Sequence, residues 1–162
     1  MANSITSDQP IGVLRLLFGL PIWLYHANLG WLVLRRVLML THTGRKCGKP
    51  RQEVLEVVAR GPSTGAYFVT AAWLGKAAWF KNIQANPDVQ VNVGTRTFKA
   101  TAFVIDRGKA AVMFLDYARR YPLAFRELAQ LMMGERLRPT PDDCLRLAQP
   151  VPMVKLAAGT SG

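Results

Sequence analysis

Hydrophobic and polar residues alternate with a period of two along several stretches of the chain, which is the pattern of half-buried β-strands. The alternation is strict over Val89–Val93 and Thr97–Ile105. In the second stretch it predicts one shared face for four side chains, Phe98, Ala100, Ala102 and Val104. Four more short strands are predicted from runs rich in apolar and β-branched residues: Arg36–Thr43, Gln52–Arg60, Ala66–Ala72 and Val151–Leu156.

Helices are predicted between these strands. The first, Lys76–Asn86, must end before Pro87. Two more, Gly108–Arg120 and Pro122–Met133, are separated by a break at Tyr121-Pro122. Another begins at Thr140, with a proline at the first helical position and acidic residues in the first turn. Six strands joined mostly by hairpins, with one helix inserted midway, predict an α+β fold built on a small antiparallel barrel with helices outside it.

The N-terminal part of the chain is strongly apolar over residues 11–34, but Arg15 and Pro21 interrupt it. Its longest uncharged part, Leu16–Tyr25, is shorter than the roughly 20 residues that a membrane-spanning helix needs. We expect an amphipathic helical segment over residues 1–36, followed by a barrel domain over residues 37–158. The segment either packs on the barrel or lies at a membrane interface, and the sequence leaves both open.

The composition indicates the class of protein but does not identify the ligand. The chain has 162 residues, half of them hydrophobic, and a formal net charge of +11, which predicts a folded domain that attracts anions. Nucleic acid, an anionic coenzyme and an anionic membrane surface all fit. The two cysteines, Cys47 and Cys144, lie far outside C-x-x-C spacing, which indicates free thiols and a cytoplasmic location. Neither histidine has a second metal ligand at a suitable spacing, so we expect no metal site.

A basic turn lies between two of the predicted strands, in the stretch T-H-T-G-R-K-C-G-K-P-R. Two glycines, Gly44 and Gly48, allow a tight turn with exposed backbone N–H groups. The side chains add four cations, which suit phosphate or carboxylate: Arg45, Lys46, Lys49 and Arg51. A solvated hairpin tip is the plain alternative, and rigid apolar strands on both sides favour a ligand-binding turn.

A second candidate stretch is W-L-G-K-A-A-W-F-K-N, where a strand end leads through Gly75 into a helix. The first N–H groups of that helix would face an anion or an electron-rich ring edge. Trp73 or Trp79 could stack on a planar ring, whereas Trp79, Phe80 and Ile83 could equally be ordinary core residues. No G-x-G-x-x-G, Walker, G-x-S-x-G or H-E-x-x-H motif is present.

The combination of G-R-K-x-G-x-x-R with W-F-x-N-x-x-A-N-P resembles the deazaflavin (F420)-dependent nitroreductase family of nitroreductase- and quinone reductase-like oxidoreductases. The similarity runs from about Leu40 to Leu156. It implies a split β-barrel that binds coenzyme F420, whose phosphate and oligoglutamate tail is strongly anionic. Arg45, Lys46, Lys49 and Arg51 match the tail-binding positions. The implied surroundings of the ring are Val54, Leu55, Thr70, Ala71, Ala72, Trp73, Gly75, Lys76 and Trp79.

The resemblance also implies an activity, hydride transfer to an apolar conjugated acceptor such as a quinone or a nitro compound, with the chain supplying orientation and electrostatics. Tyr117 and Tyr121 are the catalytic candidates, and Tyr121 is either a proton donor, a substrate wall or a packing residue. At the serine-plus-basic pair of nitroimidazole-activating members this chain has Ala72-Trp73.

Three rivals stay open: a related barrel that binds FMN, a lipid- or fatty-acid-binding barrel, and a nucleic-acid module. Four cations exceed what one FMN phosphate needs. We expect no nucleic-acid partner, because the strand aromatics Tyr67, Phe68 and Phe98 lie in apolar runs. The expected partners are the coenzyme and its acceptor, with peripheral contact at the inner face of the cell membrane as an option. The chain would be a monomer or a homodimer.

Overall fold

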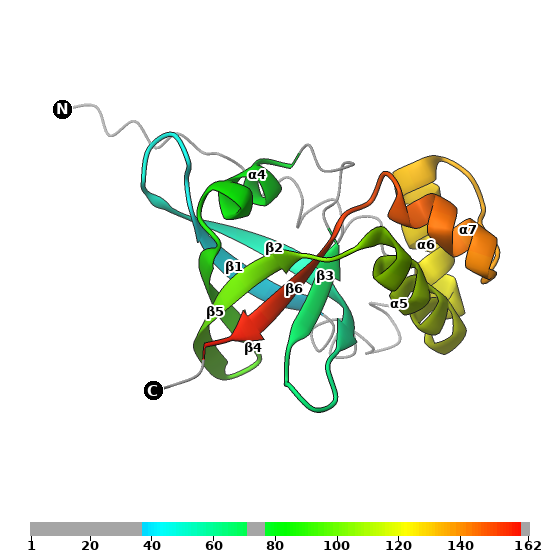
Figure 1. Cartoon of the computed structure of the whole chain (residues 1–162), viewed down its shortest axis with the longest axis horizontal. Coiled ribbons are helices and arrows are strands. Elements are labelled where there is room, and N and C mark those ends of the chain that lie inside the picture. The colour runs from blue at the N-terminus through cyan, green and yellow to red at the C-terminus, as the bar shows by residue number, and fades with distance from the viewer. Residues whose placement is uncertain (1–36, 71–76, 160–162) are drawn as a thin grey trace, which may run out of the picture.

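A closed antiparallel barrel of six strands forms the centre of the molecule (Figure 1). The computed structural model describes residues 37–70 and 77–159. Neighbouring strands follow the order β1-β2-β3-β6-β5-β4, and the last of these pairs back onto β1. The strands are β1 (Val37–Thr43), β2 (Pro50–Arg60), β3 (Tyr67–Thr70), β4 (Asp88–Val93), β5 (Arg96–Val104) and β6 (Met153–Ala158). The predicted α+β class and antiparallel barrel are confirmed.

Side chains alternate between the barrel interior and its outer surface, as the sequence pattern predicts. On β1 the buried residues are Leu38, Leu40 and His42, and β2 continues this inner face with Leu55 opposite Leu38. The predicted face of β5 is right for Ala100 and Ala102. Phe98 packs against the same core, and Val104, two positions after Ala102 in a regular register, is 50% exposed because it is the last residue of the strand.

Helix α4 (Ala78–Ala85) packs against β1 and buries Trp79, Phe80 and Ile83 in the barrel core. Its backbone leaves the helical conformation at Asn86, just before Pro87 as predicted. The other helices lie together beside the barrel (Figure 1) and share a second hydrophobic core with one face of β2. They are α5 (Arg107–Arg120), α6 (Pro122–Met133) and α7 (Pro141–Ala148).

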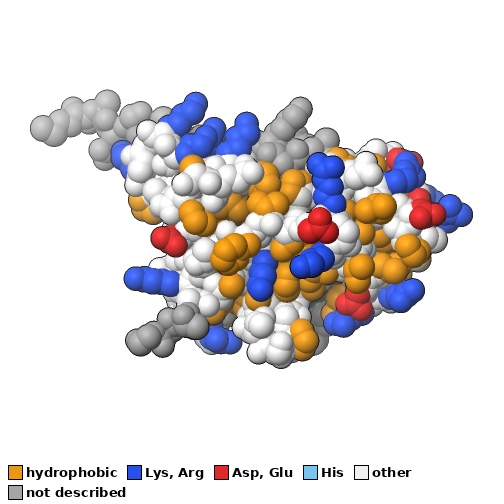
Figure 2. Space-filling view, in the orientation of Figure 1, with side chains coloured by type: hydrophobic (Ala, Val, Ile, Leu, Met, Phe, Trp, Pro, Cys, Tyr) orange, Lys and Arg blue, Asp and Glu red, His pale blue; other side chains and the backbone are white. Residues whose placement is uncertain are grey.

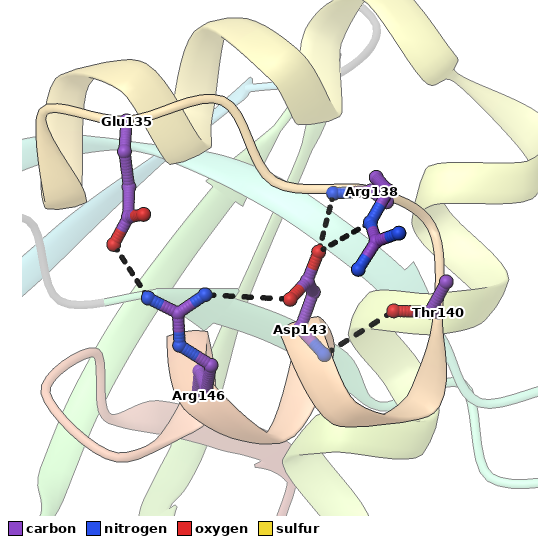
Figure 3. A network of polar contacts seen from close by, with 5 residues as sticks. All are labelled: Glu135, Arg138, Thr140, Asp143 and Arg146. Carbon is purple, nitrogen blue, oxygen red and sulfur yellow. Dashed lines mark hydrogen bonds and ion pairs between the residues drawn. The ribbon is translucent and has the colours of Figure 1, made fainter.

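The predicted start of α7 is confirmed by its cap (Figure 3). The Thr140 hydroxyl accepts the backbone N–H of Asp143 at 3.3 Å. The Asp143 carboxylate in turn accepts the backbone N–H of Arg138 at 2.8 Å and the guanidinium of Arg146 at 3.4 Å. Arg146 also pairs with Glu135 at 2.7 Å. The Arg138 N–H is the main reason that the pKa of Asp143 lies below its usual range. This network ties the α6–α7 connection to the first turn of α7.

Two predicted segments fall outside the described residues. They are the predicted N-terminal helical segment over residues 1–36 and residues 71–76, which include the end of the predicted strand Ala66–Ala72 and the start of the predicted helix Lys76–Asn86. Within residues 37–70 and 77–159, no helix has the length and apolar character needed to cross a membrane.

Candidate functional site

The basic turn is the tip of the β1–β2 hairpin, and its backbone is held tightly. The Gly44 N–H donates to the Lys49 carbonyl at 2.9 Å, and the Gly48 N–H donates to the Gly44 carbonyl at 2.8 Å. Gly48 has a φ of +66°, which favours glycine. A Cβ on Gly44 would lie 2.7 Å from Cys47 Sγ and 3.2 Å from Arg51 Nε. The two glycines are therefore needed to close the turn and to seat its side chains.

All four cations of the hairpin, Arg45, Lys46, Lys49 and Arg51, are exposed. No Asp or Glu occurs from residue 41 to residue 52. Figure 2 shows Lys and Arg side chains gathered at the end of the molecule where this hairpin and α4 lie. A rigid hairpin with several cations and no acidic residue of its own attracts anions and can bind them through charge-assisted hydrogen bonds.

The expectation that the turn offers its backbone N–H groups to a ligand is wrong for four of them. Those of Gly44 and Gly48 close the turn, and that of Arg45 donates to Asn82 Oδ1 at 3.1 Å. The N–H of Lys49 donates to the sulfur of Cys47. Because these donors are already satisfied inside the protein, an anion at this hairpin would be bound mainly by side chains.

Asn82 of α4 joins the hairpin to the barrel. Its side-chain oxygen accepts the backbone N–H of Arg45 at 3.1 Å and the Nη1 group of the same residue at 3.0 Å. Its side-chain nitrogen lies 3.1 Å from His42 Nδ1. Asn82 and His42 are 3% and 4% exposed. One buried amide thus connects α4, β1 and the tip of the hairpin.

The surroundings of His42 favour the neutral form of its ring. Burial lowers the pKa of its imidazole, and the nearby Arg51 guanidinium lowers it further. Since the Asn82 oxygen accepts both Arg45 donors, the other end of the amide is its NH₂ group, which donates to Nδ1. The remaining proton of the neutral ring is therefore on Nε2.

The thiol of Cys47 is affected by the positive charge of the hairpin. Its thiol is exposed, and its Sγ lies 3.9 Å from Arg51 Nη2. The N–H of Lys49 and then the Arg51 guanidinium lower its pKa. The turn therefore stabilises the thiolate form of Cys47 relative to that of an ordinary cysteine.

The residues predicted around the coenzyme ring fall in different environments. Val54 lies half-buried on the outer face of β2, whereas Leu55 is 4% exposed and faces the barrel interior. Thr70 is buried at the end of β3, opposite Met153 of β6. Ala71, Ala72, Trp73, Gly75 and Lys76 lie outside the described residues.

Trp79 belongs to the barrel core. It is 3% exposed and contacts Phe80 edge-on, with 6.0 Å between ring centroids. This is the environment expected from the alternative that Trp79 and Phe80 are core residues. Stacking of Trp79 on a planar ligand stays a prediction, as do the binding roles of the other ring residues.

The two tyrosines predicted to be catalytic lie where α5 meets α6. Tyr117 is 1% exposed, and its hydroxyl donates to Glu56 Oε1 of β2 at 2.5 Å. Tyr121 is 41% exposed, and its ring centroid lies 5.7 Å from that of Tyr117. It also forms the junction between the helices, because its backbone N–H donates to the Tyr117 carbonyl. Both residues thus have structural contacts, and their catalytic roles stay predictions.

Sequence reasoning missed the contribution of Asn82 and His42. Both residues lie in the motifs that carry the family resemblance, Asn82 as the polar residue of W-F-x-N and His42 two positions before the glycine of G-R-K. A polar residue next to core aromatics on a short helix is a signal from which Asn82 could have been identified. The partners of Asn82 could not be predicted, since Arg45 is 37 positions away.

Comparison with known proteins identifies relatives of the chain. Residues 25–127 match the family model described as F420H(2)-dependent quinone reductase. F420H(2)-dependent quinone reductases from two strains of Mycobacterium tuberculosis are each 38% identical to the chain over 68 residues. These alignments cover 40% of this chain and 44% of each relative. The matched part is thus less than half of the relatives' length.

Solved structures with the same fold come from proteins of several kinds. An F420-H2 dependent reductase, FDR-A, matches with a TM-score of 0.52 and 22% identity, over 75% of this chain and 94% of that one. The heme storage protein HutZ from Vibrio cholerae matches with a TM-score of 0.54 and 17% identity, over 78% and 84%. An FMN-binding protein from Nostoc punctiforme, related to pyridoxamine 5'-phosphate oxidase, has a TM-score of 0.51 and 15% identity, over 79% and 73%. These similarities confirm the predicted split β-barrel fold.

The family model spans more than half of the chain, and the matched residues include the basic hairpin, Asn82, Tyr117 and Tyr121. The chain therefore belongs to the F420H(2)-dependent quinone reductase family.

Proposed function

We propose that this protein is an oxidoreductase that uses reduced coenzyme F420 as the hydride donor to an apolar, conjugated acceptor of the quinone type. The family membership supports the proposal. The main structural support is the β1–β2 hairpin. Its turn is closed by backbone hydrogen bonds and has four exposed cationic side chains with no carboxylate among them.

The donor set of the hairpin fits the coenzyme. The tail of F420 carries a phosphate and several glutamate carboxylates, so it presents a row of anions rather than one. Arg45 and Arg51 can each bind an oxyanion through two parallel hydrogen bonds, and Lys46 and Lys49 add point charges. FMN has a single phosphate and would leave most of these cations without a ligand charge. The charge count therefore favours F420 over FMN.

In the proposed mechanism the chain binds and orients, while the coenzyme supplies hydride chemistry when bound. The hairpin would hold the tail, and the outer face of β2 at Val54 together with Thr70 and residues 71–76 would border the ring. An acceptor of the quinone type needs one hydride and one proton to become a quinol. Tyr121 is a proton-donor candidate because its side chain is 41% exposed beside Tyr117.

Peripheral membrane contact through residues 1–36 and assembly as a homodimer are separate predictions. An apolar acceptor would be met in or near a lipid bilayer, which makes a membrane-facing N-terminal segment useful to the proposed reaction.

The proposal is tested by mixing the purified protein with reduced F420 and a short-chain naphthoquinone under anaerobic conditions. We expect oxidation of the coenzyme at a rate proportional to the protein concentration, and only background oxidation without protein. A nitroimidazole in place of the quinone tests the alternative acceptor class. Copurification of tightly bound FMN, with no acceleration of F420 oxidation by any acceptor, would contradict the proposal.

A further inference from the structure

We propose that Asn82 is the positioning residue of the basic hairpin: its neutral amide orients the Arg45 guanidinium toward an anionic ligand without cancelling the charge, and His42 fixes the orientation of that amide. The inference rests on the proposed function, since it concerns how the hairpin would bind the anionic tail of the coenzyme. It assigns a specific task to a residue that does not itself carry charge.

The first step is the pair of hydrogen bonds between Asn82 and Arg45. Its side-chain oxygen accepts two hydrogen bonds from this one residue, from the backbone N–H at 3.1 Å and from Nη1 at 3.0 Å. Holding both the backbone and the tip of an arginine restricts a side chain that otherwise has a large rotamer entropy. An anion that binds the restrained guanidinium has less entropy to remove, so the hairpin is preorganised.

The second step is the choice of an amide over a carboxylate. Surface arginines commonly pair with Asp or Glu, as Arg146 does with Glu135. An aspartate at position 82 would give Arg45 the same geometry but would also neutralise its charge. A guanidinium has five N–H donors, and Asn82 accepts from Nη1 alone among those of the side chain. Arg45 therefore keeps both its charge and further donors for an anion.

The third step is the role of His42. If the amide were reversed, its NH₂ group would face the Arg45 donors and its oxygen would face the lone pair of Nδ1. The observed orientation avoids both conflicts. The observed orientation requires a neutral imidazole ring on His42. Burial favours the neutral ring, and so do the nearest cations, Arg51 opposite on β2 and Arg45 beyond the amide. Glu53 lies farther along the same face of β2, and Lys81 on α4 is exposed.

The contact also gives a physical reason for the two motifs to occur together. Arg45 belongs to G-R-K-x-G-x-x-R and Asn82 to W-F-x-N-x-x-A-N-P. The two aromatic residues of the second motif anchor α4 in the barrel core, and this places the asparagine under the hairpin. The second motif thus supports the first.

The test compares Asn82→Asp, Asn82→Ala and Arg45→Ala with a control, Gln84→Glu, which adds the same charge at an exposed position of the same helix. Dissociation constants for F420 and for tripolyphosphate are measured by calorimetry, and melting temperatures are measured without ligand. We expect Asn82→Asp to weaken F420 binding by about 10- to 100-fold, similar to Arg45→Ala, from the loss of one charge-assisted hydrogen bond. Its melting temperature should fall modestly, because the aspartate gains an ion pair with Arg45 but places a carboxylate oxygen against the lone pair of His42 Nδ1, so binding is measured where both proteins are folded. The control should change affinity by less than about threefold.

Asn82→Ala separates orientation from charge. Arg45 keeps its charge there but loses its support, so we expect a loss of affinity of about 3- to 10-fold. NMR of the Arg45 Nε–H group in the ligand-free protein should show an ordered side chain in the wild type and a mobile one in this variant.

The inference is overturned if wild-type protein binds F420 and Asn82→Asp binds it equally well. It is also overturned if Arg45 is already mobile in the ligand-free wild type. These results leave the proposed function intact. If the wild type does not bind F420 although Asn82 orders Arg45 as described, the proposed function is wrong. Asn82 would then position Arg45 for no ligand that this account identifies, and the inference would be overturned with it.

Discussion

Replacing Tyr117 with phenylalanine separates the structural and catalytic roles of this tyrosine. The change removes the hydroxyl that donates to Glu56 and leaves the ring, which is 1% exposed and packed in the core of the outer helices. A hydrogen bond to a charged group contributes about 1.5–3 kcal/mol to stability. A protein of this size loses about 2–4 °C in Tm per kcal/mol, so the variant should melt about 3–12 °C below the wild type.

The assay is urea denaturation at neutral pH, followed by circular dichroism, for the wild type, Tyr117→Phe, Glu56→Gln and the double variant. Glutamine keeps an oxygen acceptor for the hydroxyl, so Glu56→Gln is the milder change. Because the hydroxyl keeps an acceptor in Glu56→Gln, the double-mutant cycle measures how much the charge of the Glu56 carboxylate adds to this hydrogen bond. We expect a coupling energy of at least about 1 kcal/mol.

Turnover measured on the same variants distinguishes the two roles. If Tyr117 supports the structure, Tyr117→Phe should keep kcat within about threefold at a temperature where it is fully folded. A variant of unchanged stability whose kcat falls by two orders of magnitude would refute this account and make Tyr117 catalytic.

Further predictions concern the hairpin and its anchor. Gly48→Ala forces a side chain into the left-handed region, at a φ of +66°, and should lower the free energy of unfolding by about 1–2 kcal/mol in urea titrations; unchanged stability would contradict it. Iodoacetamide at pH 7.5 should alkylate Cys47 well before Cys144, because the pKa of Cys47 is lowered whereas burial raises that of Cys144 to about 11; peptide mass spectrometry that finds Cys144 modified first would contradict it. The folded protein binds a proton at His42 less readily than the unfolded chain does, because the pKa of His42 is lowered in the fold. Stability should therefore fall as the pH decreases from about 6.5 toward this lower pKa. The fall between pH 7 and pH 5.5 should be smaller in His42→Asn, and an equal fall in both proteins would contradict the assignment.

Much of the fold could be predicted because it depends on local patterns. Strict alternation in Val89–Val93 and the T-P-D-D start of α7 each report chemistry that lies within a few residues, and both elements are observed. The hairpin between β1 and β2 was predicted from its glycines and flanking apolar runs in the same way. Local sequence determines these elements because their hydrogen bonds and turns involve near neighbours.

The contacts that organise the candidate site could not be predicted in this way. Arg45 contacts Asn82 across 37 positions, and Tyr117 contacts Glu56 across 61. Each contact depends on how a helix is placed against the barrel, which no local pattern specifies. The occupied N–H group of Arg45 was missed for the same reason, since its partner comes from α4, whereas the N–H groups of Gly44 and Gly48 are bonded within the turn itself.

The central claim is that the cations of the β1–β2 hairpin bind the anionic tail of F420. It is tested most directly by titrating F420 into the wild type, into Arg45→Ala with Arg51→Ala, and into the charge-matched control Lys99→Ala with Lys109→Ala. With two charge-assisted contacts removed, affinity should fall by at least about 100-fold in the hairpin variant and stay nearly unchanged in the control. Equal weakening in both variants, or full affinity in the hairpin variant, would contradict the account.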